Sequence, residues 1–218
     1  MIKNNIPLTV LPITIQPVRR LSQLLTGLTL YGASMAILLR AELGMSPWGS
    51  FQEGLSDKTG ASYGLVTIIV GAVLLIVWIP MRQKPGIGTL ANVIVVGVAA
   101  DITLMIIDPP AALLLRILFL VSGVLLNGLS IAIYVGARLG PGPRDGLMTG
   151  LSPILGMSLR RVRTMIEVTV LAGGFLLGGT VGVGTLLYAL TVGPIVQAAL
   201  PRTIMRTTHG AETAVAPT

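Results

Sequence analysis

The sequence predicts an all-α fold: a polytopic bundle of transmembrane helices built from two related halves. Three observations predict it. Hydrophobic residues make up 53% of the 218 residues and charged residues only 11%, whereas a soluble domain carries about 25% charged residues. The chain has six apolar runs, and most of them approach or exceed the roughly 20 residues that cross a bilayer as a helix. The chain also matches itself, without gaps, at an offset of 96 positions.

The elements follow one another in a simple order. Segment 1–19 has prolines at 7, 12 and 17 and no continuous apolar run, which predicts a mobile cytoplasmic tail and not a cleavable signal. A single transmembrane domain fills 20–203, and the polar segment 204–218 is a second cytoplasmic tail. The six expected spans are Leu21–Leu39, Tyr63–Pro80, Ile87–Ile107, Leu113–Val135, Val162–Leu177 and Val183–Leu200.

Two short segments, about 46–58 and 143–156, separate the spans within each half. Each opens with a proline, Pro47 or Pro143, and proline suits the first turn of a helix. Both segments are too short and too polar for an ordinary span. They are therefore expected to be re-entrant or interfacial helices.

The self-match predicts an internal duplication with halves at 20–107 and 116–203. Glycine, proline and serine rarely fall into one ungapped register by chance, even in apolar sequence. Each half then holds three spans and one short helix, and an odd number of spans turns the second half upside down. Among the matched pairs are Arg20 and Arg116, Gly27 and Gly123, Gly44 and Gly140, Pro47 and Pro143, and Ser56 and Ser152.

The basic residues predict the orientation. With the N-terminus inside, most of them fall in cytoplasmic segments, as the positive-inside rule requires. This places the chain in the cell membrane with both termini in the cytoplasm. It also explains the net charge of +7 without a nucleic-acid partner. The cytoplasmic basic residues would be Lys3, Arg19, Arg20, Arg82, Lys84, Arg138, Arg144, Arg160, Arg161, Arg163, Arg202 and Arg206.

Composition also excludes several kinds of chemistry. The chain has no cysteine, and its one histidine, His209, lies in the C-terminal tail. Thiolate catalysis, disulfides and intramembrane imidazole sites are thus excluded, and no metal or cofactor is expected. Only carboxylates remain for catalysis, and no two of them pair convincingly. The chain is therefore expected not to be an enzyme.

The segment "GARLGPGPRDGLMTGLS" offers the first candidate site. A helix that starts at Pro143, after Gly142, would present unpaired N–H groups and a partial positive charge at its start. Arg144 adds a full charge, so these residues could bind a carboxylate or phosphate. Asp145 would offset the helix dipole in the same site. The alternative is a capped interfacial helix in which Arg144 only obeys the positive-inside rule.

Two further residues could line a substrate site. Trp48 stands in the first half where Arg144 stands in the second. It is either an aromatic anchor at the membrane interface or a surface on which a ligand stacks. Asn127 lies in an apolar span, where it would form interhelical hydrogen bonds or part of a cavity wall.

Two acids inside the spans are candidates for proton or ion coupling, because charges there are costly and usually functional or paired. Glu167 follows Arg163 by four residues, so an i,i+4 ion pair would also explain it. Asp101 has no partner within one helical turn. It would act as a relay or pair with an arginine of another span; Arg116 is one candidate, although Arg116 could pair with Asp108 instead.

The pairing of "LGMSPW" with a later "LGPGPRDGLM" resembles the YczE/YyaS-like family of bacterial integral membrane proteins. The resemblance covers residues from about 20 to 200. It implies a membrane location and a fold, and it suggests that the chain handles or exports small molecules. The positions that match the family's motif are Gly140, Gly142, Pro143, Arg144, Asp145 and Gly146.

Together these observations favour a small secondary transporter or exporter of a small, anionic molecule. The alternative is a non-transporting accessory protein that binds a partner protein or lipid. Gly174 and Gly178 form a GxxxG spacing, which indicates close helix packing or a dimer face. The expected partners are the lipid bilayer, an unknown small molecule and a second copy of the chain.

Overall fold

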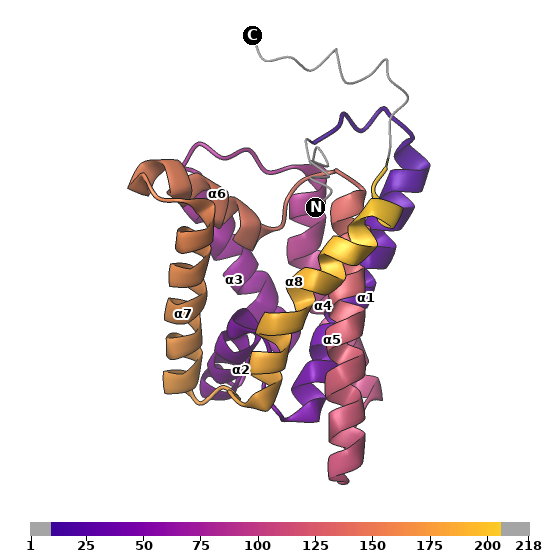
Figure 1. Ribbon diagram of the computed structural model, residues 1–218, viewed down its shortest axis with the longest axis vertical. Coiled ribbons are helices and arrows are strands. Elements are labelled where there is room, and N and C mark those ends of the chain that lie inside the picture. The colour runs from indigo at the N-terminus through magenta and orange to yellow at the C-terminus, as the bar shows by residue number, and fades with distance from the viewer. Residues whose placement is uncertain (1–9, 206–218) are drawn as a thin grey trace.

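The structure, a computed structural model, describes residues 10–205, and within that range it consists of helices and loops (Figure 1). The predicted all-α class is confirmed. The chain order of the helices is α1 (Pro17–Ala41), α2 (Pro47–Thr59), α3 (Tyr63–Trp78), α4 (Ile87–Ile106), α5 (Leu113–Gly136), α6 (Pro143–Leu155), α7 (Leu159–Leu177) and α8 (Val183–Thr203).

The two short helices α2 and α6 lie within a residue or two of their predicted positions. Ser46 caps α2, since its hydroxyl accepts a hydrogen bond from the Gly49 N–H at 3.1 Å. Each helix begins with its proline and ends at a glycine with positive φ, Gly60 or Gly156. Thirteen residues span about 20 Å, well short of the roughly 30 Å hydrocarbon core. Neither short helix alone crosses a bilayer.

Four helices of the described chain are long and apolar enough to cross a membrane: α1, α4, α5 and α8. The number rises to five if α2 and α3, which meet at an angle of 114°, form one broken span. The sequence predicted six spans. The two further candidates fall short because α3 has only 16 residues and α7 carries three arginines and Glu167 within its first nine.

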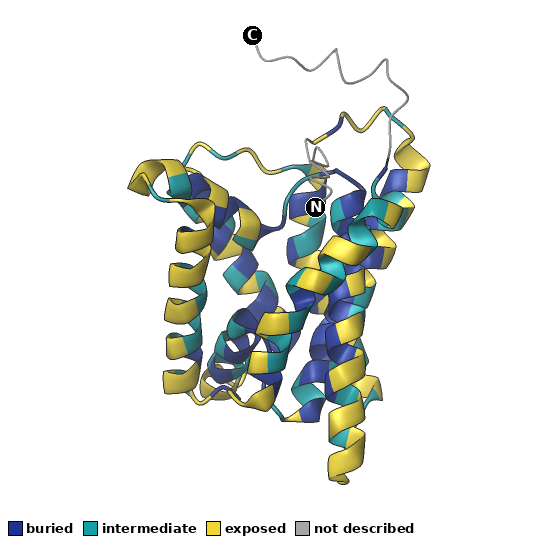
Figure 2. Cartoon of the chain, viewed as in Figure 1, coloured by how far each residue is buried: buried dark blue, intermediate teal, exposed yellow. Residues whose placement is uncertain are grey.

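The buried hydrophobic residues form two clusters: a large one in which α1 is central, and a small one of Trp48, Leu74 and Leu147 on α2, α3 and α6. Helix α1 packs most extensively on α5 and α4, while α8 lies against α5. On the other side of the molecule α7 packs on α2, and α6 packs on α3 (Figure 1). Buried residues line the inner faces, and the outer faces are exposed (Figure 2). Those faces are nevertheless apolar, with exposed Ile94, Ile102, Leu118 and Leu186, as lipid contact requires.

Each helix of the second half starts 96 residues after a helix of the first. The starting residues are Pro17 and Leu113, Pro47 and Pro143, Tyr63 and Leu159, and Ile87 and Val183. Below, the residue 96 positions away is called the counterpart. In Figure 1, α2 lies at the lower end of the molecule and α6 at the upper end.

Contacts between the halves are reciprocal. The Gly88 N–H donates to the Leu139 carbonyl at 2.9 Å, and the Gly184 N–H donates to the Leu43 carbonyl at 2.7 Å. Both residues of the second bond are the counterparts of those in the first. Reciprocity of this kind is what a two-fold relation between two units produces.

The two halves differ in how their third helix, α3 or α7, packs. In the first half α3 packs closely on α4, and a Cβ at Gly64 would lie only 2.1 Å from the Gly97 carbonyl oxygen. In the second half α7 makes almost no contact with α8 and packs on α2 instead. Gly174 serves that packing, because its Cβ position lies 2.7 Å from the Phe51 nitrogen. This glycine thus faces α2, within the molecule.

The start of the described chain is not a free tail. Leu11 is buried, and its N–H donates to the Arg138 carbonyl at 3.0 Å. The predicted mobile tail over 1–19 is therefore wrong for residues 11–15, which are held by the Leu11 bond to the loop between α5 and α6 and by bonds from Arg20 to the Pro12 and Ile15 carbonyls. Helix α1 already begins at Pro17. Residues 1–9 and 206–218, including His209, lie outside the described part of the chain.

Candidate functional site

The N-terminal ends of α2 and α6 meet inside the bundle. The Arg144 guanidinium carbon lies 5.1 Å from the centre of the Trp48 ring, in cation–π geometry. The two residues are counterparts, so matching positions of the two halves touch each other. Arg144 Nη2 donates to Gln52 Oε1 at 3.1 Å, and Nη1 lies 3.4 Å from the Tyr31 hydroxyl. Tyr31 is about midway along α1, which puts this contact deep within the bundle.

Two polar groups beside this contact have no hydrogen-bond partner in the described chain. They are the Trp48 indole N–H and the Tyr63 hydroxyl. Both residues are buried, and Tyr63 interacts electrostatically with Arg144 and Tyr31. We call Arg144, Trp48, Gln52, Tyr31 and Tyr63 the Arg144 site.

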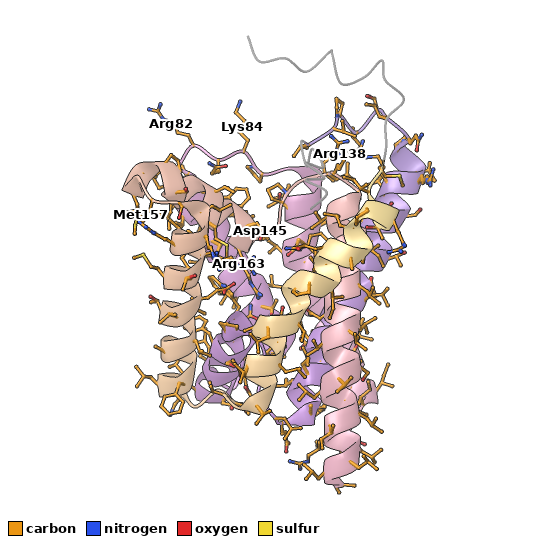
Figure 3. All side chains as sticks on the ribbon, viewed as in Figure 1. Arg82, Lys84, Arg138, Asp145, Met157 and Arg163 are labelled. Carbon is orange, nitrogen blue, oxygen red and sulfur yellow. The ribbon has the colours of Figure 1, made fainter. Side chains whose placement is uncertain are left out.

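Arg144 has no carboxylate within ion-pair distance in the described part of the chain, where the ion pairs are Arg116–Glu42 and Arg163–Glu167. Asp145, the next residue, is exposed and interacts electrostatically with both Arg163 and Arg144. Figure 3 shows Asp145 at the start of α6, with Arg163 of α7 close to it in the view. The Arg144 site therefore keeps an unneutralised charge, and acids lie in its wider surroundings.

Pro143 and Gly142 position α6. The Pro143 carbonyl accepts a hydrogen bond from the Trp78 indole N–H at 3.0 Å. Gly142 is buried, and Asp145 Oδ2 and the Tyr134 hydroxyl lie within 3.4 Å of where its Cβ would be. Both residues thus fix the place where α6 begins, and with it the place of Arg144.

Asn127 joins three helices next to the Arg144 site. Its Nδ2 donates to Ser34 Oγ on α1 at 2.8 Å, and its Oδ1 accepts from the Tyr188 hydroxyl on α8 at 2.8 Å. Interhelical hydrogen bonding by Asn127 is confirmed. Tyr188 in turn interacts electrostatically with Tyr31 and Arg144, so this network borders the site.

Asp101 caps a helix, and it bonds the two residues on either side of Tyr63. Its carboxylate accepts from the Ser62 hydroxyl at 2.5 Å and from the Gly64 N–H at 2.6 Å. Unpaired N–H groups and the helix dipole make the start of α3 a favourable place for an acid. Pairing of Asp101 with Arg116 was wrong, and so was pairing of Arg116 with Asp108, since Arg116 Nη1 lies 2.8 Å from Glu42 Oε2.

Glu167 forms the predicted i,i+4 ion pair, with the Arg163 Nε 2.9 Å from its Oε1. Arg163 also interacts electrostatically with Asp145. The structure therefore brings Arg144, Trp48 and Asp145 to one region and borders it with Asn127 and the Arg163–Glu167 pair. A proton-coupling role for Asp101 or Glu167 stays a prediction.

Sequence reasoning missed Tyr31, Gln52 and Tyr63. One signal pointed to Tyr31, because it is the counterpart of Asn127, which the sequence did single out. Gln52 lies one turn after Trp48 on α2, on the same helix face. Nothing in the sequence marks Tyr63, whose contact with the site depends on the bend between α2 and α3.

A second buried charge lies at the upper end of the molecule. Arg20 is 1% exposed and donates hydrogen bonds to five backbone carbonyls. The acceptors, which we call the Arg20 cage, are the carbonyls of Leu11, Pro12, Ile15, Ala137 and Arg138, at 2.6 to 3.1 Å. Its counterpart, Arg116, bonds the Pro110 carbonyl and Glu42, and Glu42 is the counterpart of Arg138.

Known proteins resemble most of this chain. The profile of a family of unknown function, DUF6198, matches residues 18–201. An uncharacterized protein of Haemophilus influenzae is 37% identical over 179 residues, which cover 82% of each chain. The uncharacterized membrane protein YczE of Bacillus subtilis is 35% identical over 175 residues, 80% of this chain and 81% of YczE. The uncharacterized protein YyaS of the same organism is 25% identical over 179 residues, 80% of this chain and 89% of YyaS. No solved structure matches.

Proposed function

Since the chain belongs to the DUF6198 family of YczE/YyaS-like proteins and is a membrane protein, we propose that it is a small secondary transporter or exporter of a small, anionic molecule. The substrate would bind at the Arg144 site, between the two halves, in the middle of the membrane. The chain would act by binding and moving its substrate, without catalysis and without a cofactor.

One observation carries this proposal: the starts of two short, membrane-embedded helices meet at an unneutralised arginine. Discontinuous helices whose N-termini point to a central site are typical of secondary transporters. Intramembrane charges are costly and usually functional. Structural arginines of this chain have their donors taken up by acids or carbonyls, as Arg163 has with Glu167 and Arg20 with the five carbonyls of its cage, whereas Arg144 has only Gln52 and Tyr31 as hydrogen-bond partners.

The finer architecture belongs to the same proposal: six spans in two inverted halves, with both termini in the cytoplasm. The equal offsets of the helix starts and the reciprocal loop contacts support two related halves. The opposite ends occupied by α2 and α6 support inversion (Figure 1). Arg82, Lys84 and Arg138 all lie at the upper end (Figure 3), which favours that end as the cytoplasmic one.

Cysteine labelling tests the inversion. Lys58 and Ile154 are counterparts, both are exposed near the ends of α2 and α6, and neither bonds another side chain in the described chain. We expect Lys58→Cys to react with a membrane-impermeant maleimide in intact cells and Ile154→Cys to react only after permeabilisation. The chain has no cysteine of its own, so the parent protein is the blank. Labelling of both from one side would exclude inverted halves.

Transport itself is tested in proteoliposomes with an imposed pH gradient. Organic acids and their neutral amides, supplied as a mixture, are quantified inside the vesicles by mass spectrometry. We expect gradient-driven movement of at least one acid, and the Arg144→Gln variant should reduce it more than tenfold, because a charge-assisted hydrogen bond contributes about 1.5–3 kcal/mol. Asp101→Asn should abolish the dependence on the gradient if Asp101 couples protons. Absence of any movement above empty vesicles would contradict the proposal.

One observation favours the alternative, a non-transporting accessory protein that binds a partner in the bilayer. The outer faces of α5 and α8 form an open apolar groove of about 390 Å³ whose lining includes Leu125, Leu187, Pro194 and Ile195. A helix of a partner, or of a second copy in a homodimer, would bury it. This function would be favoured over transport if a stoichiometric partner co-purified from the native membrane and the proteoliposomes showed no solute movement above empty vesicles.

A further inference from the structure

The charge of the Arg144 site calls for one negative charge from a ligand. Arg144 is partly buried within the bundle, and no carboxylate of the described chain lies within ion-pair distance of it. An unpaired charge in a low-dielectric interior is costly, and pairing with an opposite charge removes much of that cost. The cation–π contact with Trp48 compensates only part of the cost of burying the Arg144 charge. A monoanion bound here would give a neutral pair.

The hydrogen-bond groups of the site point to an acceptor as ligand. A guanidinium has five N–H donors, and two contacts, to Gln52 and Tyr31, account for two of the Arg144 donors. The Tyr63 hydroxyl and the Trp48 indole N–H find no partner in the described chain, although the residues are only 4% and 7% exposed. Buried donors without acceptors are rare in folded proteins. A ligand with several acceptor oxygens would satisfy all of them.

These two arguments select among anions. One guanidinium balances one negative charge, so a phosphate dianion would leave an excess of charge inside the bundle. The planar donor fork of arginine matches the two oxygens of a carboxylate. The surrounding rings of Trp48, Tyr31 and Tyr134, of which the last two lie 5.9 Å apart, suit an apolar body. We infer that the Arg144 site binds a small organic monocarboxylate, a substrate class that rests on the proposed transport function.

Binding to the purified protein tests this inference without requiring transport. The probe is hexanoate, which does not absorb with tryptophan, and Trp48 is one of two tryptophans in the chain. We expect hexanoate to change the tryptophan emission saturably and to raise the thermal unfolding midpoint. Hexanamide, which has the same size but no charge, controls for partition into detergent. Inorganic phosphate tests the competing anion.

Two variants assign the binding to named groups. Arg144→Gln should weaken hexanoate binding by roughly tenfold or more, as expected for the loss of a charge-assisted hydrogen bond. Tyr63→Phe removes a hydroxyl that has no partner in the described chain, so the unliganded protein should fold as well as the parent. Its affinity for hexanoate should still fall several-fold. This variant keeps the test decisive if Arg144→Gln does not fold.

The outcomes distinguish a failure of the carboxylate inference from a failure of the transport proposal. Equal responses to hexanoate and hexanamide, undiminished binding by Tyr63→Phe, or binding of phosphate in place of hexanoate would overturn the inference. If carboxylates do not bind but another solute moves in the proteoliposomes, the substrate class is wrong and the transport proposal stands. If hexanoate binds and nothing moves, the site is confirmed as a carboxylate site and the transport proposal fails.

Discussion

Replacing Arg20 with alanine is expected to destabilise the protein by about 3 kcal/mol or more, because each buried acceptor left without a donor costs about 1–3 kcal/mol and several lose theirs together. The guanidinium of Arg20 is fully enclosed and is the donor to all five carbonyls of the Arg20 cage. Alanine would leave the carbonyls of Leu11, Ile15 and Ala137 without a donor in the described chain, whereas those of Pro12 and Arg138 keep a backbone N–H. It would also leave a void where water has little access. The cage joins residues 11–15, α1 and the loop after α5, so their mutual packing would be lost together.

The measurement is the thermal unfolding midpoint of the purified protein, followed by size-exclusion chromatography after heating. Arg19→Ala is the matched control, because Arg19 is the adjacent arginine on the same helix and is exposed; we expect a change within about 0.5 kcal/mol. Arg20→Lys should be nearly as damaging as Arg20→Ala, since an ammonium has three donors and a different geometry. An Arg20→Ala protein with the midpoint of Arg19→Ala would show that the cage contributes little.

Replacing Gly146 with alanine is expected to be the most damaging single-methyl change in the chain. A Cβ at position 146 would lie 1.8 Å from Cζ2 of the Trp78 ring, far inside van der Waals contact. Trp78 is 1% exposed and its indole N–H is bonded to the Pro143 carbonyl, so the ring cannot step aside without breaking that bond. We expect a loss at or above the upper end of the about 1–3 kcal/mol typical of overpacking.

The control is Gly173→Ala inside α7, where a Cβ would meet only the Phe51 ring, at 3.5 Å, an ordinary van der Waals contact. In a helix interior, alanine is favoured over glycine by up to about 1 kcal/mol, so this variant should unfold at or above the temperature of the parent. A double variant, Gly146→Ala with Trp78→Leu, should lose less stability than the two single changes added together, because the clash is absent without the ring. The prediction fails if Gly146→Ala and Gly173→Ala unfold at the same temperature.

Some of the fold followed from the sequence because it is encoded locally. Pro47 and Pro143 mark helix starts, and the glycines at 60 and 156 mark helix ends, so the short helices were placed within a residue or two. The ion pair of Arg163 with Glu167 was predictable for the same reason, since four residues on a helix fix the distance.

The full set of residues in the Arg144 site could not be predicted from the sequence, because it depends on how distant segments pack against one another. Tyr63 comes within electrostatic range of Arg144 because α2 and α3 meet at 114°, and no local pattern encodes that angle. Asp101 and Arg116 each had several candidate partners among charged residues far away in the chain. The partners they have, Ser62 and Glu42, were decided by how the helices pack.

The unequal packing of the two halves has a mechanical consequence. In the first half, the hydrogen bonds from Ser62 and Gly64 to Asp101 pin α3 to α4. In the second half, α7 has almost no hold on α8. The α7 helix packs on α2 of the first half instead, so it is coupled to the opposite half, whereas α3 is coupled to α4 of its own half. A displacement of α7 relative to α8 should therefore cost little free energy, because few contacts between these two helices would break. A displacement of α3 relative to α4 must break both hydrogen bonds to the Asp101 carboxylate.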